Sequence, residues 1–149
     1  MKAFKYRMQT KLDIASLEEQ MAKEELLLRS RERDRIQEEL DDIIKRQLEL
    51  EQSLVLLILE GFSMDEFMIH RDYVPVLREF RLDKETDLAR AERNFEKARL
   101  ILVEKTRETQ TLKKLREKEW NAYLQEVLRE EQKVIDEVAI NRHYRKNLS

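Results

Sequence analysis

The chain contains almost no residues that interrupt helices. Among its 149 residues there is one glycine, Gly61, and one proline, Pro75, and both lie near the midpoint. Because glycine and proline are the residues least favourable to a helix interior, their scarcity leaves two long arms in which nothing breaks a helix. Two such arms joined by one short break fold most economically as a helical hairpin. We therefore predict an all-α protein with a first helix over about 5–60, a turn over about 61–72 and a second helix over about 73–145.

Cysteine is absent, which excludes a disulfide scaffold, a thiolate metal site and a cysteine nucleophile. Long apolar runs are absent too, since the longest covers only residues 54–59. A membrane-spanning helix needs about twenty apolar residues, and the apolar region of a signal peptide about seven or more. We expect a cytoplasmic chain that is neither an integral membrane protein nor secreted by a signal peptide.

Aromatic residues are few, at 7% of the chain, whereas charged residues make up 42%. Ordinary globular domains carry about a quarter of charged residues, so a wide core is excluded and a narrow apolar seam between helices is favoured. The 30 basic and 32 acidic residues give a net charge of -2, which provides no general attraction to nucleic acid or anionic lipid. The length fits a single coiled-coil domain over residues 1–149.

No arrangement of residues indicates catalysis. One glycine cannot build a glycine-rich phosphate loop, so the chain is not itself a P-loop nucleotide hydrolase. His70 and His143 are too far apart on a hairpin to share a metal ion, and the clustered carboxylates have no histidine at helical spacing. Basic runs are short and flanked by acids, so nucleic acid is not an expected partner. We predict a protein that is not an enzyme, with no metal and no cofactor.

Apolar residues recur at alternating spacings of three and four along both arms, as in a coiled coil. In the first arm, ten of fourteen such positions are apolar. Two polar exceptions, Arg29 and Arg33, are expected near Glu104 and Glu108 across the hairpin. The residues predicted to form the hairpin seam are Leu12, Leu26, Ile36, Leu40, Ile43, Leu50, Leu54, Leu88, Phe95, Leu102 and Leu112.

The predicted turn makes the two arms unequal. If positions 60 and 74 face each other, the numbers of paired residues add to about 134, and position 8 meets roughly position 126. About twenty residues of the second helix, from Val127 to Lys146, then extend unpaired over about 30 Å. Their apolar side chains would be exposed, which is typical of a partner-binding surface.

Three shorter segments also carry predictions. Phe4, Tyr6 and Met8 are expected to pack on the second arm near Trp120 and Tyr123. Ser63 and Glu66 have the spacing of a capping box, although we place the start of the second long helix at Asp72, with Pro75 in its first turn. The residues Tyr73, Val76, Leu77 and Phe80 either close the end of the hairpin or bind a partner.

The order of these features resembles the flagellar export protein FliJ family. The carboxyl-terminal stretch 129–142 is similar to the closing motif of that family, with Gln132, Asp136, Glu137, Ala139 and Arg142 at the expected spacing. Residues 4–13 are similar to its usual opening. Gly61, followed by the apolar residues that begin at Tyr73, matches its midpoint. The resemblance spans the whole chain.

The resemblance implies a two-helix antiparallel coiled coil and a non-enzymatic part of the type III export apparatus at the base of the flagellum. It implies three partners: the hexameric export ATPase, the membrane-embedded export gate through its cytoplasmic part, and export chaperones. It places the protein on the inner face of the cell membrane, in the cytoplasm. The residues it assigns to ATPase binding are Arg129, Gln132, Lys133, Asp136, Glu137, Val138 and Arg142. Those it assigns to the gate or to chaperones are Tyr73, Val76, Leu77 and Phe80.

Two other functions remain open at this point. The corresponding stalk component of a virulence secretion system shares the fold and differs in its partners. A structural spacer that self-associates through its seam would bury the unpaired helix in a homodimer, whereas a coupling protein is expected to be monomeric when free.

Overall fold

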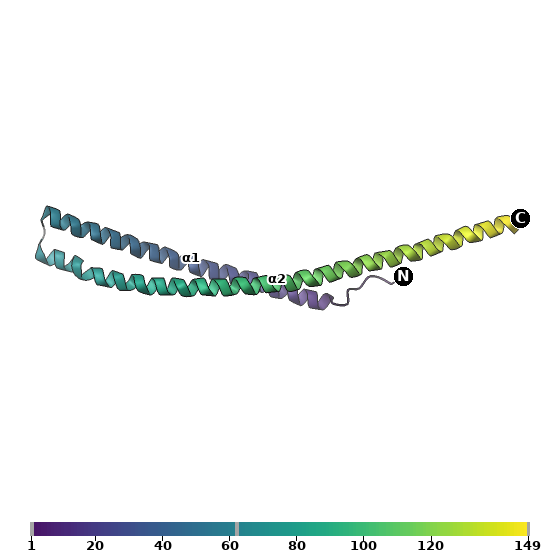
Figure 1. The fold of residues 1–149 in the computed structure, drawn as a ribbon, viewed down its shortest axis with the longest axis horizontal. Coiled ribbons are helices and arrows are strands. Elements are labelled where there is room, and N and C mark those ends of the chain that lie inside the picture. The colour runs from purple at the N-terminus through teal and green to yellow at the C-terminus, as the bar shows by residue number, and fades with distance from the viewer. Residues whose placement is uncertain (1, 62, 149) are drawn as a thin grey trace. The chain divides into compact units, whose positions relative to one another are not determined.

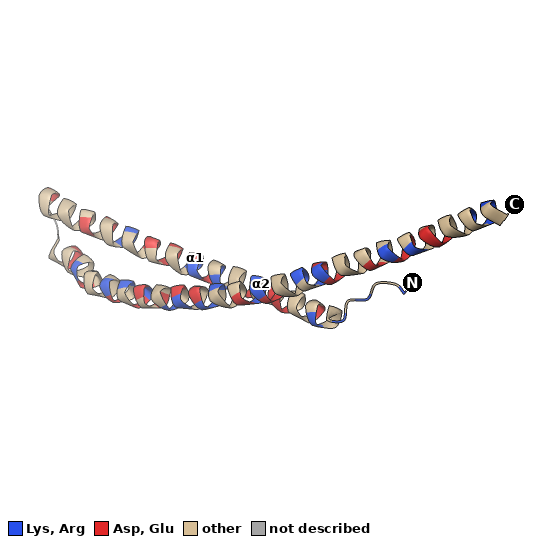
Figure 2. Ribbon diagram, turned by 45° about the vertical axis from the view of Figure 1, so that its right-hand side comes forward, with Lys and Arg blue, Asp and Glu red and all other residues tan. Residues whose placement is uncertain are grey.

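The computed structural model describes residues 2–61 and 63–148, which form two helices and no strand. Helix α1 runs over Gln9–Glu60 and helix α2 over Met64–Leu148. The two helices pair as an α-helical hairpin, and basic and acidic residues alternate along both of them (Figures 1 and 2). The contacts divide the chain into two compact units. One, the turn unit, is Met21–Val103; the other, the terminal unit, comprises Met1–Gln20 and Glu104–Ser149.

The break between the helices is shorter than the sequence suggested. Gly61 follows the last residue of α1 with a φ of 88°, a left-handed conformation that glycine adopts without the steric cost of a side chain. Ser63 then caps α2, because its hydroxyl oxygen accepts a hydrogen bond of 3.3 Å from the Glu66 N–H. Asp65 and Glu66 place negative charge in the first turn. The prediction of a cap at Ser63 is confirmed, and α2 begins at Met64 instead of residue 73.

Pro75 therefore lies inside α2 and not in its first turn, which corrects the prediction that the helix starts at Asp72. Proline has no N–H, so the carbonyl of Arg71 loses its helical hydrogen-bond donor. Adjacent packing compensates for this loss, because Leu77 is only 1% exposed and Val74 is half-buried. The cap at Ser63 and the burial of Leu77 explain why the helix continues through the proline.

Replacement of Pro75 by alanine is expected to stabilise the protein by about 2 kcal/mol. Alanine restores the N–H and removes the clash of the proline ring with the preceding turn, and both effects outweigh the larger conformational entropy of the unfolded chain. Urea denaturation followed by circular dichroism measures the change. An unchanged or lower midpoint would mean that the helix needs the proline geometry at this position.

The register of the hairpin follows from the short break. In the turn unit, Lys84 pairs with Glu39, and Arg81 donates a hydrogen bond of 3.0 Å to Gln47. In the terminal unit, Lys105 lies 3.0 Å from Glu18. The residue numbers of these pairs add to between 123 and 128. The predicted value of about 134 was too high because the predicted turn was too long.

The buried residues form a narrow row between the helices. Ala22, Ala91 and Ala98 are buried in the turn unit, where their small side chains allow close approach. Of the predicted seam residues, Leu12, Ile36, Leu40 and Leu112 are buried, and Leu26, Ile43, Leu50, Leu54, Leu88, Phe95 and Leu102 are half-buried. Thr109, which is 1% exposed, is the buried polar residue of the terminal unit. Its hydroxyl lies 3.2 Å from the Ala15 carbonyl and 3.0 Å from the Lys105 carbonyl, within hydrogen-bond reach of both.

The two seam arginines find partners within the turn unit. Arg29 bonds Glu25 at 2.8 Å and Glu32 at 3.1 Å on its own helix, and the hydrogen bond to Glu25 raises its pKa above the usual value. The Arg33 guanidinium lies 4.3 Å from the centre of the Phe95 ring, in a cation–π contact. The predicted layer with Glu104 and Glu108 is thus corrected, since Arg29 is satisfied by neighbouring acids and Arg33 by an aromatic face.

Candidate partner-binding site

The last part of α2 extends beyond the residues that pair with it in the terminal unit. We call residues 124–148 the carboxyl-terminal extension. Within it, Val127 is half-buried and every described residue from 128 to 148 is exposed. The exposed apolar side chains include Leu128, Val134, Ile135, Val138 and Ile140, with exposed fractions between 51% and 64%. Apolar side chains at this density on an unpaired helix are typical of a surface that a partner covers.

The extension has two faces, as the helical spacing of 100° per residue requires. Val127, Val134 and Val138 share one face, with Leu128 and Ile135 beside them, and we call these five residues the apolar stripe. Of the seven residues predicted to bind the ATPase, all are exposed. Val138 and Arg142 lie on the side of the stripe.

The other predicted contacts lie on the polar side of the extension. There Gln132 donates a hydrogen bond of 2.9 Å to Asp136, and Arg129 lies 4.0 Å from Glu126. Lys133 and Glu137 share this side with them. Exposed ion pairs and amide bonds of this kind contribute only tenths of a kcal/mol, so they leave these side chains available to a partner at little cost.

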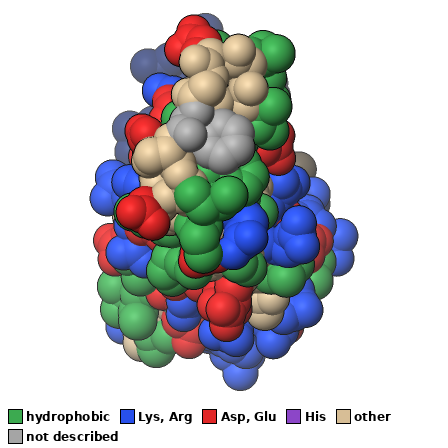
Figure 3. Space-filling model, turned by 90° about the vertical axis from the view of Figure 1, so that its left-hand side faces the viewer, with side chains coloured by type: hydrophobic (Ala, Val, Ile, Leu, Met, Phe, Trp, Pro, Cys, Tyr) green, Lys and Arg blue, Asp and Glu red, His purple; other side chains and the backbone are tan. Residues whose placement is uncertain are grey.

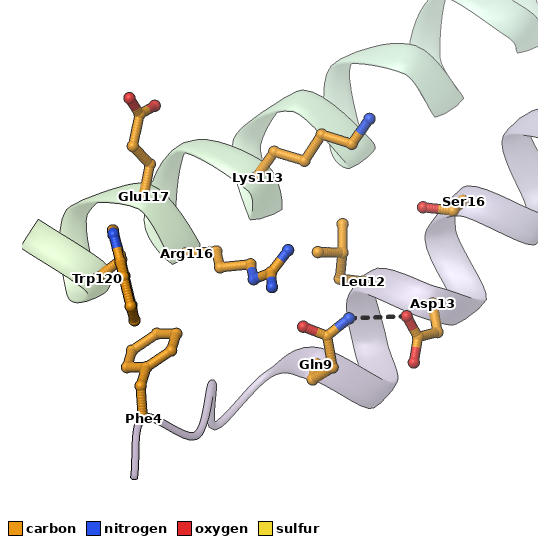
Figure 4. A pocket seen from close by; sticks show the side chains of 9 residues that line it. All are labelled: Phe4, Gln9, Leu12, Asp13, Ser16, Lys113, Arg116, Glu117 and Trp120. Atoms are coloured by element: carbon orange, nitrogen blue, oxygen red, sulfur yellow. Dashed lines mark hydrogen bonds between the residues drawn. The ribbon is translucent and has the colours of Figure 1, made fainter.

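An extended segment at the amino terminus covers α2 where the extension starts. We call residues 2–8 the strap. Phe4 makes an edge-to-face contact with Trp120, with ring centres 4.9 Å apart (Figure 4). It also makes a tilted contact with Tyr123 at 5.4 Å. The predicted packing near Trp120 and Tyr123 is confirmed for Phe4, whereas Tyr6 and Met8 pack in a cluster with Leu12 and Leu112. Helix α1 begins after the strap, at Gln9, and not near residue 5.

Two tyrosine hydroxyls fix the strap to α2. Tyr6 is 5% exposed and donates a hydrogen bond of 2.9 Å to the carbonyl of Leu112. Tyr123 donates one of 3.1 Å to the carbonyl of Lys2. The bond of Tyr6 satisfies a buried hydroxyl that would otherwise lose water, and the exposed bond of Tyr123 attaches the backbone of Lys2 to α2. Helical spacing gives no signal for an extended segment, so these two bonds were not predictable from the sequence pattern.

Exposed apolar side chains also gather around the turn (Figure 3). Of the four residues predicted there, Tyr73 and Val76 are each 41% exposed and Phe80 is 52% exposed. Leu77 is buried and packs inside the hairpin, so the expectation that it contacts a partner is corrected. The members of this turn patch are Val55, Ile58, Leu59, Met64, Ile69, Tyr73, Val76 and Phe80. The uncharged run over residues 54–59 was the sequence signal for its first members.

The histidines make only local contacts. The Nδ1 atom of His70 lies 2.9 Å from the carbonyl oxygen of Glu66, and the Nε2 atom of His143 lies 3.2 Å from the Asn147 amide nitrogen. Among residues 2–61 and 63–148, no group of three or more histidine, aspartate or glutamate residues is arranged to hold a metal ion. In the same part of the chain, no helix has both the length and the apolar character to cross a membrane.

Comparison with protein families finds a match for the chain. The family described as the flagellar FliJ protein matches residues 4–148, which includes most of the strap, the turn and the carboxyl-terminal extension. Searches of curated proteins and of solved structures find no match. A family match over nearly the whole chain agrees with the two-helix hairpin and with the order of motifs along it. The chain belongs to the FliJ family and is a component of the flagellar protein export apparatus.

Proposed function

We propose that this protein binds the hexameric export ATPase through its carboxyl-terminal extension and links that enzyme to the export gate and to export chaperones. It acts without catalysis of its own, in the cytoplasm against the inner face of the membrane at the flagellar base. Family membership supports the setting. The observation that carries the proposal is the exposure of every described residue from 128 to 148 in a segment rich in apolar side chains.

The two faces of the extension suit entry into a ring of subunits. The apolar stripe supplies contact area that loses water on binding, at roughly 25 cal/mol for each Å² of apolar surface. The polar side, with Arg129, Lys133 and Asp136, supplies charged groups that fix orientation and register. A ring of subunits contacts a helix at its centre from every side, whereas a flat partner contacts only one side. A helix with an apolar stripe and a polar side therefore suits the centre of a ring.

Coupling to ATP hydrolysis follows if the ring grips the helix differently in different nucleotide states. A ligand shifts an equilibrium only by its difference in affinity for the two states. Subunits that bind the extension more tightly in one nucleotide state are therefore biased towards that state, and by reciprocity nucleotide binding changes the affinity for the extension. The protein thereby promotes ring assembly or turnover.

The turn patch is the surface that we assign to the export gate or to chaperones. Tyr73, Val76 and Phe80 are exposed together there, whereas Leu77 is buried and does not reach a partner. Aromatic residues such as Tyr73 and Phe80 contribute strongly to binding when a partner covers them. This assignment leaves the carboxyl-terminal extension free for the ATPase.

The purified chain is expected to accelerate ATP hydrolysis by the export ATPase from the same cell. Steady-state phosphate release with and without the chain measures the effect, and sedimentation across a range of concentrations checks that the free chain is monomeric. Absence of any acceleration, with both proteins folded and bound to each other, would remove the coupling role. A stable homodimer that covers the extension would favour a structural spacer instead.

A further inference from the structure

Two open hollows lie beside the strap in the terminal unit. The first has a volume of about 600 Å³ and lies between α1 and α2, with Phe4, Leu12 and Trp120 as its apolar walls (Figure 4). The second has a volume of about 890 Å³ and is lined by the strap itself, including Phe4 and Tyr6. Arg116 lines both hollows, so the two hollows around the strap share one guanidinium.

The second hollow is basic and has no acidic residue in its lining. Its cations are Lys5, Arg7 and Arg116. Over residues 2–61 and 63–148, these three side chains form no ion pair, although Lys105 on the same helix pairs with Glu18 at 3.0 Å. The hydrogen bond to Glu18, followed by the charge of Glu108, raises the pKa of Lys105 above its ordinary value. Lys105 is thus neutralised by acids of the chain, whereas the three cations of the second hollow remain available to a partner.

The lining of the first hollow includes two acids, Asp13 and Glu117, beside the cations Lys113 and Arg116. Arg116 reaches into the space between the helices, whereas the Glu117 carboxylate points out of it (Figure 4). The Asp13 carboxylate accepts a hydrogen bond of 2.8 Å from the Gln9 side chain. The guanidinium is therefore presented to solvent beside an aromatic wall formed by Phe4 and Trp120.

We propose that the strap and the facing part of α2 form a docking site for an acidic peptide segment of a partner protein, one in which an apolar side chain lies next to carboxylates. Arg116 binds a carboxylate with two parallel hydrogen bonds, the geometry that a guanidinium favours, and Lys5 and Arg7 attract its neighbours. The apolar side chain fills the space between Leu12 and Trp120. This site lies outside the residues assigned to the ATPase, so it is a further interaction and does not depend on the proposed function.

Charge and shape favour an acidic peptide over a polyanion. A nucleic acid strand or an anionic membrane needs a continuous track of cations, whereas Asp13 and Glu117 interrupt the track in the first hollow. The net charge of -2 also gives a long polyanion no attraction to the rest of the chain. A short segment with a few carboxylates contacts only the cations that line the two hollows. Its apolar side chain packs against the apolar wall of the first hollow.

The only tryptophan of the chain, Trp120, reports on this site without a label. The probe is a short synthetic peptide of glutamate, leucine and glycine, titrated into the full-length protein at low salt. We expect a saturable change in Trp120 emission, because the peptide displaces water from a side chain that is 42% exposed. Arg116→Gln should weaken binding about tenfold or more, as loss of a charge-assisted pair implies.

Lys118→Gln is the matched control, since Lys118 is an exposed cation on the same helix that lines neither hollow. It should leave the affinity within about twofold. Circular dichroism should show both variants folded, because both side chains are exposed. Three results would overturn the proposal: no saturable signal, equal binding of a peptide with glutamine in place of glutamate, or preferential binding of single-stranded RNA or phosphatidylglycerol vesicles.

Discussion

Removal of residues 127–149 is expected to abolish acceleration of the export ATPase while the remaining chain stays folded. Val127 is half-buried and every described residue from 128 to 148 is exposed, so the deletion removes no fully buried residue of the hairpin. The buried residues of the terminal unit, including Tyr6, Leu12 and Thr109, all remain. Stability should therefore change little, whereas the proposed contact surface is lost almost entirely.

A pair of point variants separates the apolar stripe from the length of the helix. Val134→Ser combined with Val138→Ser should remove most of the acceleration, because both side chains lie on the stripe. Ile140→Ser is the control, since Ile140 is 64% exposed and lies away from the stripe by helical spacing. Phosphate release measures activity, and circular dichroism measures helix content. Equal loss in the control, or a truncated chain that loses cooperative melting, would contradict the assignment.

Leu77→Ala is expected to destabilise the protein by about 3 kcal/mol, the largest effect of a single substitution that we predict. Leu77 is 1% exposed, and truncation of a buried leucine removes its transfer free energy and leaves a cavity. The narrow seam of a hairpin has no second layer that could fill the space. The midpoint of thermal unfolding should fall by about 10 °C, given the usual relation for a chain of this size.

Leu82→Ala is the control for this prediction. Leu82 lies on the same helix but is 57% exposed, so its truncation should cost less than about 0.5 kcal/mol. Urea denaturation of both variants gives the two free energies of unfolding. Equal effects at the two positions would mean that Leu77 is not buried in solution.

The hairpin was predictable because its signals are local and repeated. The three-four spacing identified Leu12, Ile36 and Leu40 as seam positions, and all three are buried. One glycine and one proline restricted the break to a single region. The unpaired extension followed from the unequal arms, since an error of several residues in register still leaves the second helix longer.

The start of α2 was predicted wrongly because two nearby residues each indicate the beginning of a helix. Ser63 and Pro75 both indicate a helix start, and the sequence does not say which prevails. The cap prevails because Leu77, beyond the proline, is buried by tertiary packing that no local pattern reports. Thr109 was likewise a polar interruption in the pattern, yet its hydroxyl lies within hydrogen-bond reach of the carbonyls of Ala15 and Lys105.

The contacts between the strap and α2 depend on the number of residues in the strap. Lys2 and Tyr6 are four positions apart in the strap, but their partners Tyr123 and Leu112 are eleven apart on α2. An extended chain advances about 3.3 Å per residue and a helix about 1.5 Å, so each strap residue covers about two to three residues of α2. One residue inserted between Phe4 and Tyr6 would therefore shift the Phe4 ring by about half a helical turn and separate it from Trp120.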